Sequence, residues 1–477
     1  MPAPRVPRLL TALERTVRRR GDEPALFAAD TTLTWRELAR RAGGVARRLA
    51  AEGLAPGDRV ALLLPNGWRF AVALLGGLMA GATVSPLNPM LAAAERARIL
   101  ADLRPRTVLD AAGDETADWS LSLEPRAPAL ILYTSGSTGR PKGAVLSHAA
   151  LDAALVSWAG PVMGLTAADC VLATLPLSHS FGVNGALLAP ILAGARVALV
   201  DPFTPPGVLA AIAQHGVTVF PAVATMFRRL LDAPKLDVSE LKTLRIAVSG
   251  AAPCPWELAQ EWRARTGVRI LRGYGMTELF RPISFRSDDA RDVPESIGRP
   301  VPGVELRIVD DAGTVLPWDG AAVGEIQIRG PWVTARYYLD EDTQKFQDGW
   351  LRTGDVGSID SLGFIQITDR AKDVIKSGGE WISSVELENE LMSHPSVLEA
   401  AVIAKPDERW TERPLACVVC KEGANPSAED LRKHLEPLVA KWWLPDEFAF
   451  IEAVPKTSVG KFDKKVLRRR LAEGELT

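Results

Sequence analysis

The sequence predicts an α/β protein with a large N-terminal domain of two α/β layers plus a small β-barrel-like subdomain, followed by a small α+β C-terminal domain. Its 477 residues exceed what one hydrophobic core usually holds, so the length favours several domains. Over residues 33–250, helical patterns alternate with short apolar strands, which is typical of βαβ units in a parallel sheet. After residue 303 the pattern changes to strands separated by turns that contain Asp and Gly, which predicts antiparallel β structure.

The two α/β layers follow each other along the chain. In the first, an amphipathic helix at residues 35–53 precedes short apolar strands at 58–65, 82–87 and 195–200. The same alternation of strand and helix recurs over residues 216–250. We expect both runs to form parallel sheets within one large domain.

A third pattern begins after residue 369. Residues 372–404 predict a strand, a glycine turn and a helix, and residues 428–439 predict another amphipathic helix. We therefore place the domain boundary near residues 369–372, with a large domain over 1–369 and a small domain over 370–477.

Composition and charge exclude several classes of protein. A formal net charge of −2 and a pI near 6.3 leave no global basic field for a nucleic acid. Four cysteines are too few for a disulfide framework, and Cys417 and Cys420 lie in an apolar run that predicts a buried strand. Glycine and proline interrupt the most apolar stretch, residues 70–87, so we expect no membrane span. The N-terminus lacks the apolar region of a secretory signal, and we predict a cytoplasmic protein.

The segment YTSGSTGRPKG, residues 133–143, follows an apolar strand and has the composition of a phosphate-binding loop. Glycine and small hydroxyl residues let backbone N–H groups approach phosphate oxygens, and a lysine adds a point charge. It is not a Walker A sequence, because Pro141 precedes the lysine and the glycine spacing differs. The candidate phosphate ligands are Thr134, Ser135, Gly136, Ser137, Thr138, Gly139 and Lys142.

This segment resembles the signature loop of the adenylate-forming superfamily, which includes acyl-CoA synthetases, luciferases and the adenylation domains of nonribosomal peptide synthetases. Further motifs similar to those of the superfamily follow in the same order: LPLSHSFG, SGAAP, GYGMTE, GEIQIRGP, GWLRTGDVG, DRAKDVIKSGGEWIS and PKTSVGKFDKK. The resemblance implies ATP-dependent activation of a small-molecule carboxylic acid to an acyl-AMP with release of pyrophosphate. It then implies transfer of the acyl group to a thiol, either CoA or the phosphopantetheine of an acyl carrier protein.

The resemblance also assigns the nucleotide site. Glu278 matches the Mg²⁺ ligand, and Thr277 matches the hydroxyl that touches the α-phosphate. A hard carboxylate oxygen suits Mg²⁺, which uses few protein ligands beside phosphate. Asp355 offers two acceptors for the ribose hydroxyls, and Arg370 matches a second ribose or phosphate contact. The expected adenine platform consists of Tyr274 and Gly275 with Gly250, Ala251 and Ala252, where Gly250 and Ala251 leave room for the ring.

Lys461 matches the mobile lysine that bridges the carboxylate and the α-phosphate, although Lys456, Lys464 and Lys465 are nearby alternatives. Because it lies far beyond the domain boundary, a moving small domain must deliver it to ATP. Lys372 matches the hinge of that motion. The thiol-acceptor side is expected at Gly378, Gly379 and Trp381.

The sequence indicates the acid pocket less directly than the nucleotide site. Phe181 stands where amino-acid-activating relatives carry an aspartate, which disfavours an α-amino acid. The expected lining is mostly apolar and suits an alkyl or aryl acid; it comprises Phe181, Gly182, Val183, Asn184, Ala222, Val223, Ala252, Leu279 and Arg281. His179, which we also place among the catalytic candidates, and Trp381 are candidates to gate the acid tunnel.

The C-terminal motifs SGGEWISSVELEN and KWWLPDEF resemble those of medium- and long-chain fatty acyl-CoA synthetases. This resemblance favours an aliphatic, fatty acid as the substrate and CoA as the acceptor. The alternative is a stand-alone enzyme that loads a β-amino, aryl or dicarboxylic starter acid onto a carrier protein in natural-product biosynthesis. Asn184 could bind a β-amino or hydroxyl group, and Arg281 a distal carboxylate. The short linker between residues 110 and 129 also favours a dedicated biosynthetic enzyme. A non-catalytic relative and a luciferase-like oxygenase are further alternatives.

Overall fold

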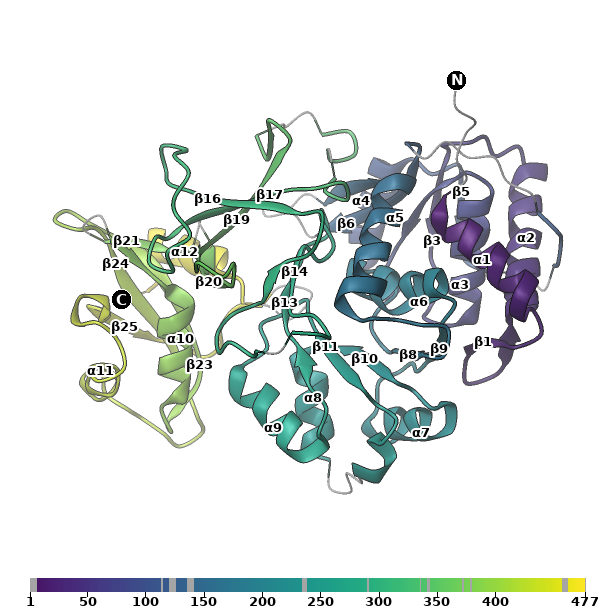
Figure 1. Cartoon of the computed structure of the whole chain (residues 1–477). Helices are drawn as coiled ribbons and strands as arrows, with labels where there is room; N and C mark the ends of the chain where they lie inside the picture. The colour runs from purple at the N-terminus through teal and green to yellow at the C-terminus, as the bar shows by residue number, and fades with distance from the viewer. Residues whose placement is uncertain are drawn as a thin grey trace. The chain divides into compact units, whose positions relative to one another are not determined.

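The structure is a computed structural model (Figure 1). It describes residues 7–112, 115–119, 126–134, 141–233, 238–289, 291–334, 336–340, 344–370, 373–377, 380–456 and 462–476, with only the backbone at residues 370, 380 and 381. Within the chain there are two compact units. The first comprises Met1–Leu306 with Ile328–Arg352, and the second comprises Arg307–Gln327 with Thr353–Thr477.

A five-stranded sheet in the first unit has the strand order β5-β3-β4-β6-β7. The strands are β3 (Arg59–Leu62), β4 (Thr83–Pro86), β5 (Thr107–Leu109), β6 (Pro128–Thr134) and β7 (Lys142–Ser147). All its pairings are parallel except that of β6 with β7, which form an antiparallel hairpin. Helix α2 (Trp35–Ala51) begins with a capping box in which Thr34 and Glu37 exchange hydrogen bonds, and α3 (Trp68–Met79) packs against it.

A second, seven-stranded sheet has the order β12-β11-β10-β8-β9-β1-β2. The strands are β1 (Pro24–Phe27), β2 (Thr32–Thr34), β8 (Cys170–Ala173), β9 (Arg196–Leu199), β10 (Val219–Ala222), β11 (Ile246–Ser249) and β12 (Ile270–Leu271). Only β1 and β2 pair antiparallel. These two sheets confirm the predicted α/β layers. The strand expected at 195–200 in the first run, β9, belongs to the second sheet because it pairs with β8 and β1.

Helices α7 (Pro205–His215), α8 (Ala224–Leu231) and α9 (Trp256–Thr266) pack against β8, β10 and β11 around one apolar core. Phe220, Phe227 and Trp262 meet edge to face in that core, with ring centroids 5.3 and 5.0 Å apart. The remaining helices of the unit are α1 (Arg8–Arg20), α4 (Ala93–Leu103), α5 (His148–Ser157), α6 (Ala189–Ala193), the short 3₁₀ helix η3 (Val238–Leu241) and two π-helical segments, η1 (Trp158–Val162) and η2 (Phe181–Leu188).

The antiparallel β structure predicted after residue 303 is present, and it begins earlier than predicted. Before residue 303, the short strands β13 (Gly273–Tyr274), β14 (Ile283–Ser284) and β15 (Arg299–Pro300) already pair antiparallel. They are followed by β16 (Glu305–Val309), β17 (Gly324–Arg329), β18 (Phe346–Gln347), β19 (Trp350–Ile359) and β20 (Ile365–Arg370). Strand β19 pairs antiparallel with β18 at Phe346 and Leu351, and with β20 at Asp355 and Arg370.

The C-terminal part of the second unit is an α+β structure. Its sheet contains β21 (Ile375–Ser377), β22 (Glu380–Ile382), β23 (Val397–Asp407), β24 (Thr411–Cys420) and β25 (Glu447–Phe450), beside helices α10 (Ser384–Ser393), α11 (Ala428–Leu435), η4 (Lys441–Trp443) and α12 (Lys464–Ala472). Cys417 and Cys420 lie on β24 as predicted, and burial raises the pKa of Cys417 to about 11. In the described part of the chain, no helix combines the length and hydropathy needed to cross a bilayer.

Candidate active site

The hairpin of β6 and β7 presents the ends of the predicted phosphate loop. Thr134, the last residue of β6, stands opposite Lys142, the first residue of β7, and its hydroxyl donates a hydrogen bond to the Lys142 carbonyl at 3.4 Å. The loop therefore starts and ends at the same point of the sheet edge. Its predicted ligands at positions 135–139 lie outside the described residues.

Lys142 contacts Asp340 and Tyr337 among the described residues. Its ammonium forms an ion pair with Asp340 at 2.8 Å and lies 5.0 Å from the ring centroid of Tyr337. The side chains of Lys142 and Asp340 each keep a quarter of their surface exposed.

Tyr337 also joins this cation to Glu278. The Tyr337 hydroxyl donates a hydrogen bond to Oε1 of Glu278, and the ammonium of Lys345 lies 3.9 Å from the same oxygen. Glu278 is 4% exposed and its backbone carbonyl accepts a hydrogen bond from Thr334 at 2.7 Å. The sequence interpretation missed Tyr337, Asp340 and Lys345. The paired tyrosines that follow the GEIQIRGP motif were the available signal.

Glu278 fits the predicted magnesium site. Among the described residues there is no group of three or more His, Cys, Asp or Glu side chains placed to hold a metal ion. Glu278 supplies a hard carboxylate, and its Oε2 takes part in neither the Tyr337 nor the Lys345 contact. One carboxylate is what Mg²⁺ needs when phosphate oxygens and water complete its octahedron.

The residues predicted for adenine lie at the carboxyl ends of β11 and β12, the edge where α/β sheets usually bind ligands. Tyr274 is half-buried on β13, and Thr277 is half-buried three residues further on. Ala251 and Ala252 are exposed, and Ala251 has a φ of 65°, a conformation that is uncommon for a residue with a side chain. This strained turn brings backbone to the surface beside the strand end.

Buried Arg281 holds these two strand ends together. Its guanidinium donates to the carbonyls of Ser249 at 2.7 Å and Leu271 at 3.0 Å, and to the Ser284 hydroxyl at 3.1 Å. Burial lowers its pKa to about 9. Arg281 thus bonds the last residue of β11 to the last residue of β12, just before two of the predicted nucleotide motifs.

The Arg281 guanidinium also explains why Gly273 and Gly250 carry no side chain. A Cβ atom at Gly273 would lie 2.3 Å from Arg281, and one at Gly250 would lie 3.0 Å from Arg281 and 3.1 Å from Phe181. The room beside Gly250, which the sequence suggested for the adenine ring, is filled in the structure by these side chains.

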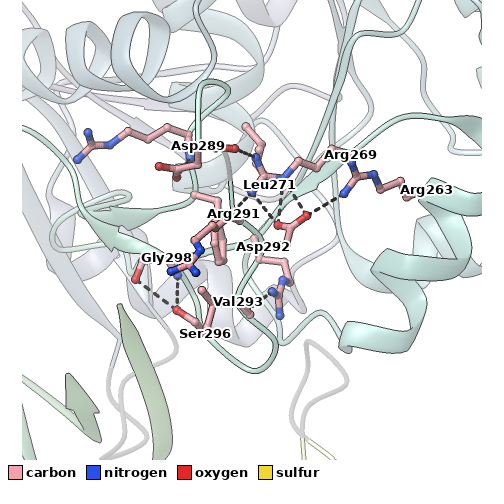
Figure 2. A network of polar contacts seen from close by, with 12 residues as sticks. Arg263, Arg269, Leu271, Asp289, Arg291, Asp292, Val293, Ser296 and Gly298 are labelled. Carbon is pink, nitrogen blue, oxygen red and sulfur yellow. Dashed lines mark hydrogen bonds and ion pairs between the residues drawn. The ribbon is translucent and has the colours of Figure 1, made fainter. Parts of the chain in front are cut away.

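A second polar network fixes the chain segment after GYGMTE. Figure 2 shows Arg269, immediately before β12, donating to the Asp292 carboxylate at 2.7 and 3.0 Å and to the Asp289 carbonyl at 2.6 Å. Arg263 of α9 adds a 3.3 Å ion pair to Asp292. These contacts attach Asp289 and Asp292 to the start of β12 and so support the strand that leads into Tyr274.

The predicted acid pocket is built mainly from η2, and π-helical segments of this kind often occur at functional sites. Phe181 is half-buried at its start, whereas the other predicted lining residues Gly182, Val183, Asn184, Ala222 and Leu279 are buried and Val223 is half-buried. The Asn184 amide donates to the Ser180 hydroxyl at 3.2 Å, and its Oδ1 is buried without a hydrogen-bond partner among the described residues. His179 is exposed. The side chains at these predicted positions are mostly apolar.

In the second unit, Asp355 and Arg370 are cross-strand partners on β19 and β20, so the backbone brings the two predicted ribose contacts together. The predicted residues Lys372, Gly378, Gly379 and Lys461 lie outside the described residues, as does the side chain of Trp381.

Two of the lysines that were alternatives to Lys461 are engaged elsewhere. Lys456 forms an ion pair with Glu399 at 2.5 Å, and Lys464 is buried in an ion pair with Glu388 at 2.6 Å. A β-bridge joins Lys456 to Phe462, so the chain is fixed on both sides of positions 457–461.

Comparison with known proteins agrees with this geometry. Residues 13–122 and 110–338 match the family model of the AMP-binding enzymes, and residues 386–461 match the model of the AMP-binding enzyme C-terminal domain. A long-chain-fatty-acid–CoA ligase from Thermus thermophilus is 37% identical over 491 residues, covering 92% of this chain and 90% of the relative. A feruloyl-CoA synthase from an Amycolatopsis species is 35% identical over 470 residues, covering 92% of this chain and 94% of the relative.

Among solved structures, ATP-bound MatB from Rhodopseudomonas palustris matches with a TM-score of 0.86 at 30% identity, covering 97% of this chain and 99% of that chain. The family models together span more than half of the chain, and the relatives match it over nearly its full length. The chain therefore belongs to the AMP-binding enzyme family and is an AMP-forming acid–thiol ligase.

Proposed function

We propose that this ligase activates an aliphatic, fatty carboxylic acid with Mg²⁺ and ATP and transfers the acyl group to CoA. The observation that supports the proposal is the contact of Tyr337 with both Glu278 and Lys142, the carboxylate that we propose for the metal and the cation that we propose for phosphate. Attack of a carboxylate on the α-phosphate brings two anions together, and cations at this point lower that barrier.

In this proposal Glu278 holds Mg²⁺, which when bound neutralises charge on the phosphate oxygens. Lys142 and the loop at 134–139 bind phosphate, and Thr277 contacts the α-phosphate. Tyr274, Gly275 and the exposed Ala251 and Ala252 receive the adenine, while Asp355 and Arg370 bind the ribose. Lys461 bridges the acid and the α-phosphate during adenylation.

The second half-reaction needs a different arrangement of the small domain, which we propose spans residues 370–477 and turns about Lys372. After that motion, Gly378 and Gly379 give the pantetheine arm of CoA close access to the backbone, and Trp381 and His179 gate the acid. The names of the relatives, which are CoA ligases and synthases, support CoA as the acceptor.

The acid is proposed from the expected lining on η2, at the end of β10 and in the segment before β14, whose side chains are apolar apart from Asn184 and Arg281. The test is release of pyrophosphate from ATP by the purified chain, measured with single acids from alkyl, aryl, β-amino and dicarboxylic classes, with and without CoA. We expect pyrophosphate and AMP with alkyl acids, and an acyl-CoA when CoA is added. Release of pyrophosphate with amino or dicarboxylic acids alone would reject the alkyl acid.

A second candidate is an enzyme that loads a starter acid onto an acyl carrier protein. The unpaired Oδ1 of buried Asn184 favours it, since a β-amino or hydroxyl group on the acid would supply the missing donor. Replacing Asn184 with Leu should then weaken use of the β-substituted acid more than use of the unsubstituted acid. Equal effects on both acids would remove this candidate.

A further inference from the structure

We propose that the side chain of Phe181 closes the acid pocket and restricts this ligase to acids with a short hydrocarbon chain. The inference rests on the proposed function and narrows its substrate class. It is independent of which thiol accepts the acyl group.

The phenyl ring of Phe181 spans the space between η2 and the end of β11. A Cβ atom placed on Gly185, one turn further along η2, would lie 3.2 Å from one edge of the ring. A Cβ atom placed on Gly250, just after β11, would lie 3.1 Å from the ring. The ring therefore fills the gap between the helix and the strand end, which in the proposed acid pocket is the space a longer alkyl chain would need.

Buried groups close the space behind the ring. Trp158 meets Phe181 edge to face with centroids 5.9 Å apart, is 1% exposed, and donates from its indole nitrogen to the Gly185 carbonyl at 3.2 Å. The guanidinium of Arg281 lies 4.9 Å from the Trp158 ring centroid. Moving Trp158 or Arg281 would break buried hydrogen bonds, so the pocket cannot lengthen easily in that direction.

Phe181 is less constrained than Trp158 and Arg281. Its side chain is half-buried, and its neighbours Gly185 and Gly250 contribute no side chain that would fill the space if the ring were removed. Shortening this one side chain should therefore open room for additional methylene groups without disturbing the hydrogen bonds of Trp158 and Arg281. Accommodating or excluding a methylene group in an apolar pocket changes kcat/KM by about tenfold to a few hundredfold.

The test compares the purified wild-type chain with F181A and F181L, using kcat/KM for pyrophosphate release with butanoate, octanoate and hexadecanoate. The control is F203A, because Phe203 is a half-buried phenylalanine packed on the core of α7 to α9. We expect the wild type and F203A to favour the shorter acids. In F181A the ratio of hexadecanoate to butanoate should rise by about tenfold or more, and F181L should show a smaller rise in the same direction.

A gain in use of the long acid cannot arise from mere loss of folding. The inference would be overturned if the wild type used hexadecanoate better than butanoate, or if F181A and F181L left the ratio unchanged. Failure of the wild type to release pyrophosphate with any acid would instead overturn the proposed function, and this inference with it.

Discussion

The Tyr337 hydroxyl donates a hydrogen bond to the Glu278 carboxylate, although 59 residues separate the two along the chain. The contact fixes the orientation of the proposed magnesium ligand. Partners of this kind commonly change metal affinity or activity by about tenfold to a hundredfold when they are removed.

We therefore predict that Tyr337→Phe raises the Mg²⁺ concentration needed for half-maximal ATP binding by about tenfold. Titration calorimetry with ATP at a series of Mg²⁺ concentrations measures this directly. Tyr338→Phe is the matched control, because the Tyr338 hydroxyl donates to the Leu103 carbonyl at 3.3 Å and not to Glu278. The same Mg²⁺ dependence in wild type and Tyr337→Phe would show that the hydroxyl does not orient a metal ligand.

The buried ion pair of Lys464 and Glu388 gives a stability prediction. The two side chains are 10% and 8% exposed and their charged atoms are 2.6 Å apart. Glu388→Gln leaves the ammonium of Lys464 without its counter-charge, which should lower the free energy of unfolding by about 3–5 kcal/mol. Thermal and denaturant unfolding, followed by circular dichroism, will measure the loss.

Glu399→Gln is the control for that variant. Glu399 pairs with Lys456, whose side chain is 46% exposed, so its loss should cost only about 0–1 kcal/mol. Equal destabilisation by the two substitutions would contradict the difference in burial on which the prediction rests.

His148 predicts a pH dependence of stability. Burial lowers the pKa of this histidine from 6.5 to about 4, so the folded state binds its proton only at lower pH than the unfolded state does. Its contribution to stability is complete above pH 6.5 and is lost as pH falls toward 4, by at most about 3 kcal/mol.

The His148→Gln variant isolates this contribution. The difference in the free energy of unfolding between wild type and variant should shrink as pH is lowered through that window. Denaturant titrations at several pH values measure it, and a difference that stays constant with pH would refute the assigned titration.

Substitution of Lys461 should affect the two half-reactions differently. Lys461→Ala should nearly abolish formation of the acyl-adenylate while largely sparing thioester formation from a preformed adenylate, because the lysine charge acts on the α-phosphate only in the first step. Single-turnover assays of each step measure this. Equal loss in both steps would remove the role proposed for Lys461.

The sequence suggested two pairs of residues that the structure brings together. Thr134 and Lys142 were expected at the ends of one loop, and the structure places them opposite each other on β6 and β7. Asp355 and Arg370 were expected in one site, and they are neighbours across β19 and β20. Such residues can be predicted because the residue types within each short motif indicate the group that the motif binds.

The contacts that the sequence could not predict connect distant motifs. Asp340 is far from Lys142 along the chain, and no spacing rule links an aspartate in one segment to a lysine in another. Gly250 and Ala251 suggested room for the adenine ring, whereas Arg281 and Phe181 occupy the room beside Gly250, which only the packing of three segments shows. Similarly, β9 joins the second sheet through pairings that strand patterns alone do not specify.

Exchange of isotope between pyrophosphate and ATP, measured with the acid present and CoA omitted, tests the central claim most directly. A reversible acyl-adenylate step predicts acid-dependent exchange without CoA, with AMP as the nucleotide product when CoA is then added. Exchange that required CoA, or formation of ADP in place of AMP, would contradict activation of the acid as an adenylate.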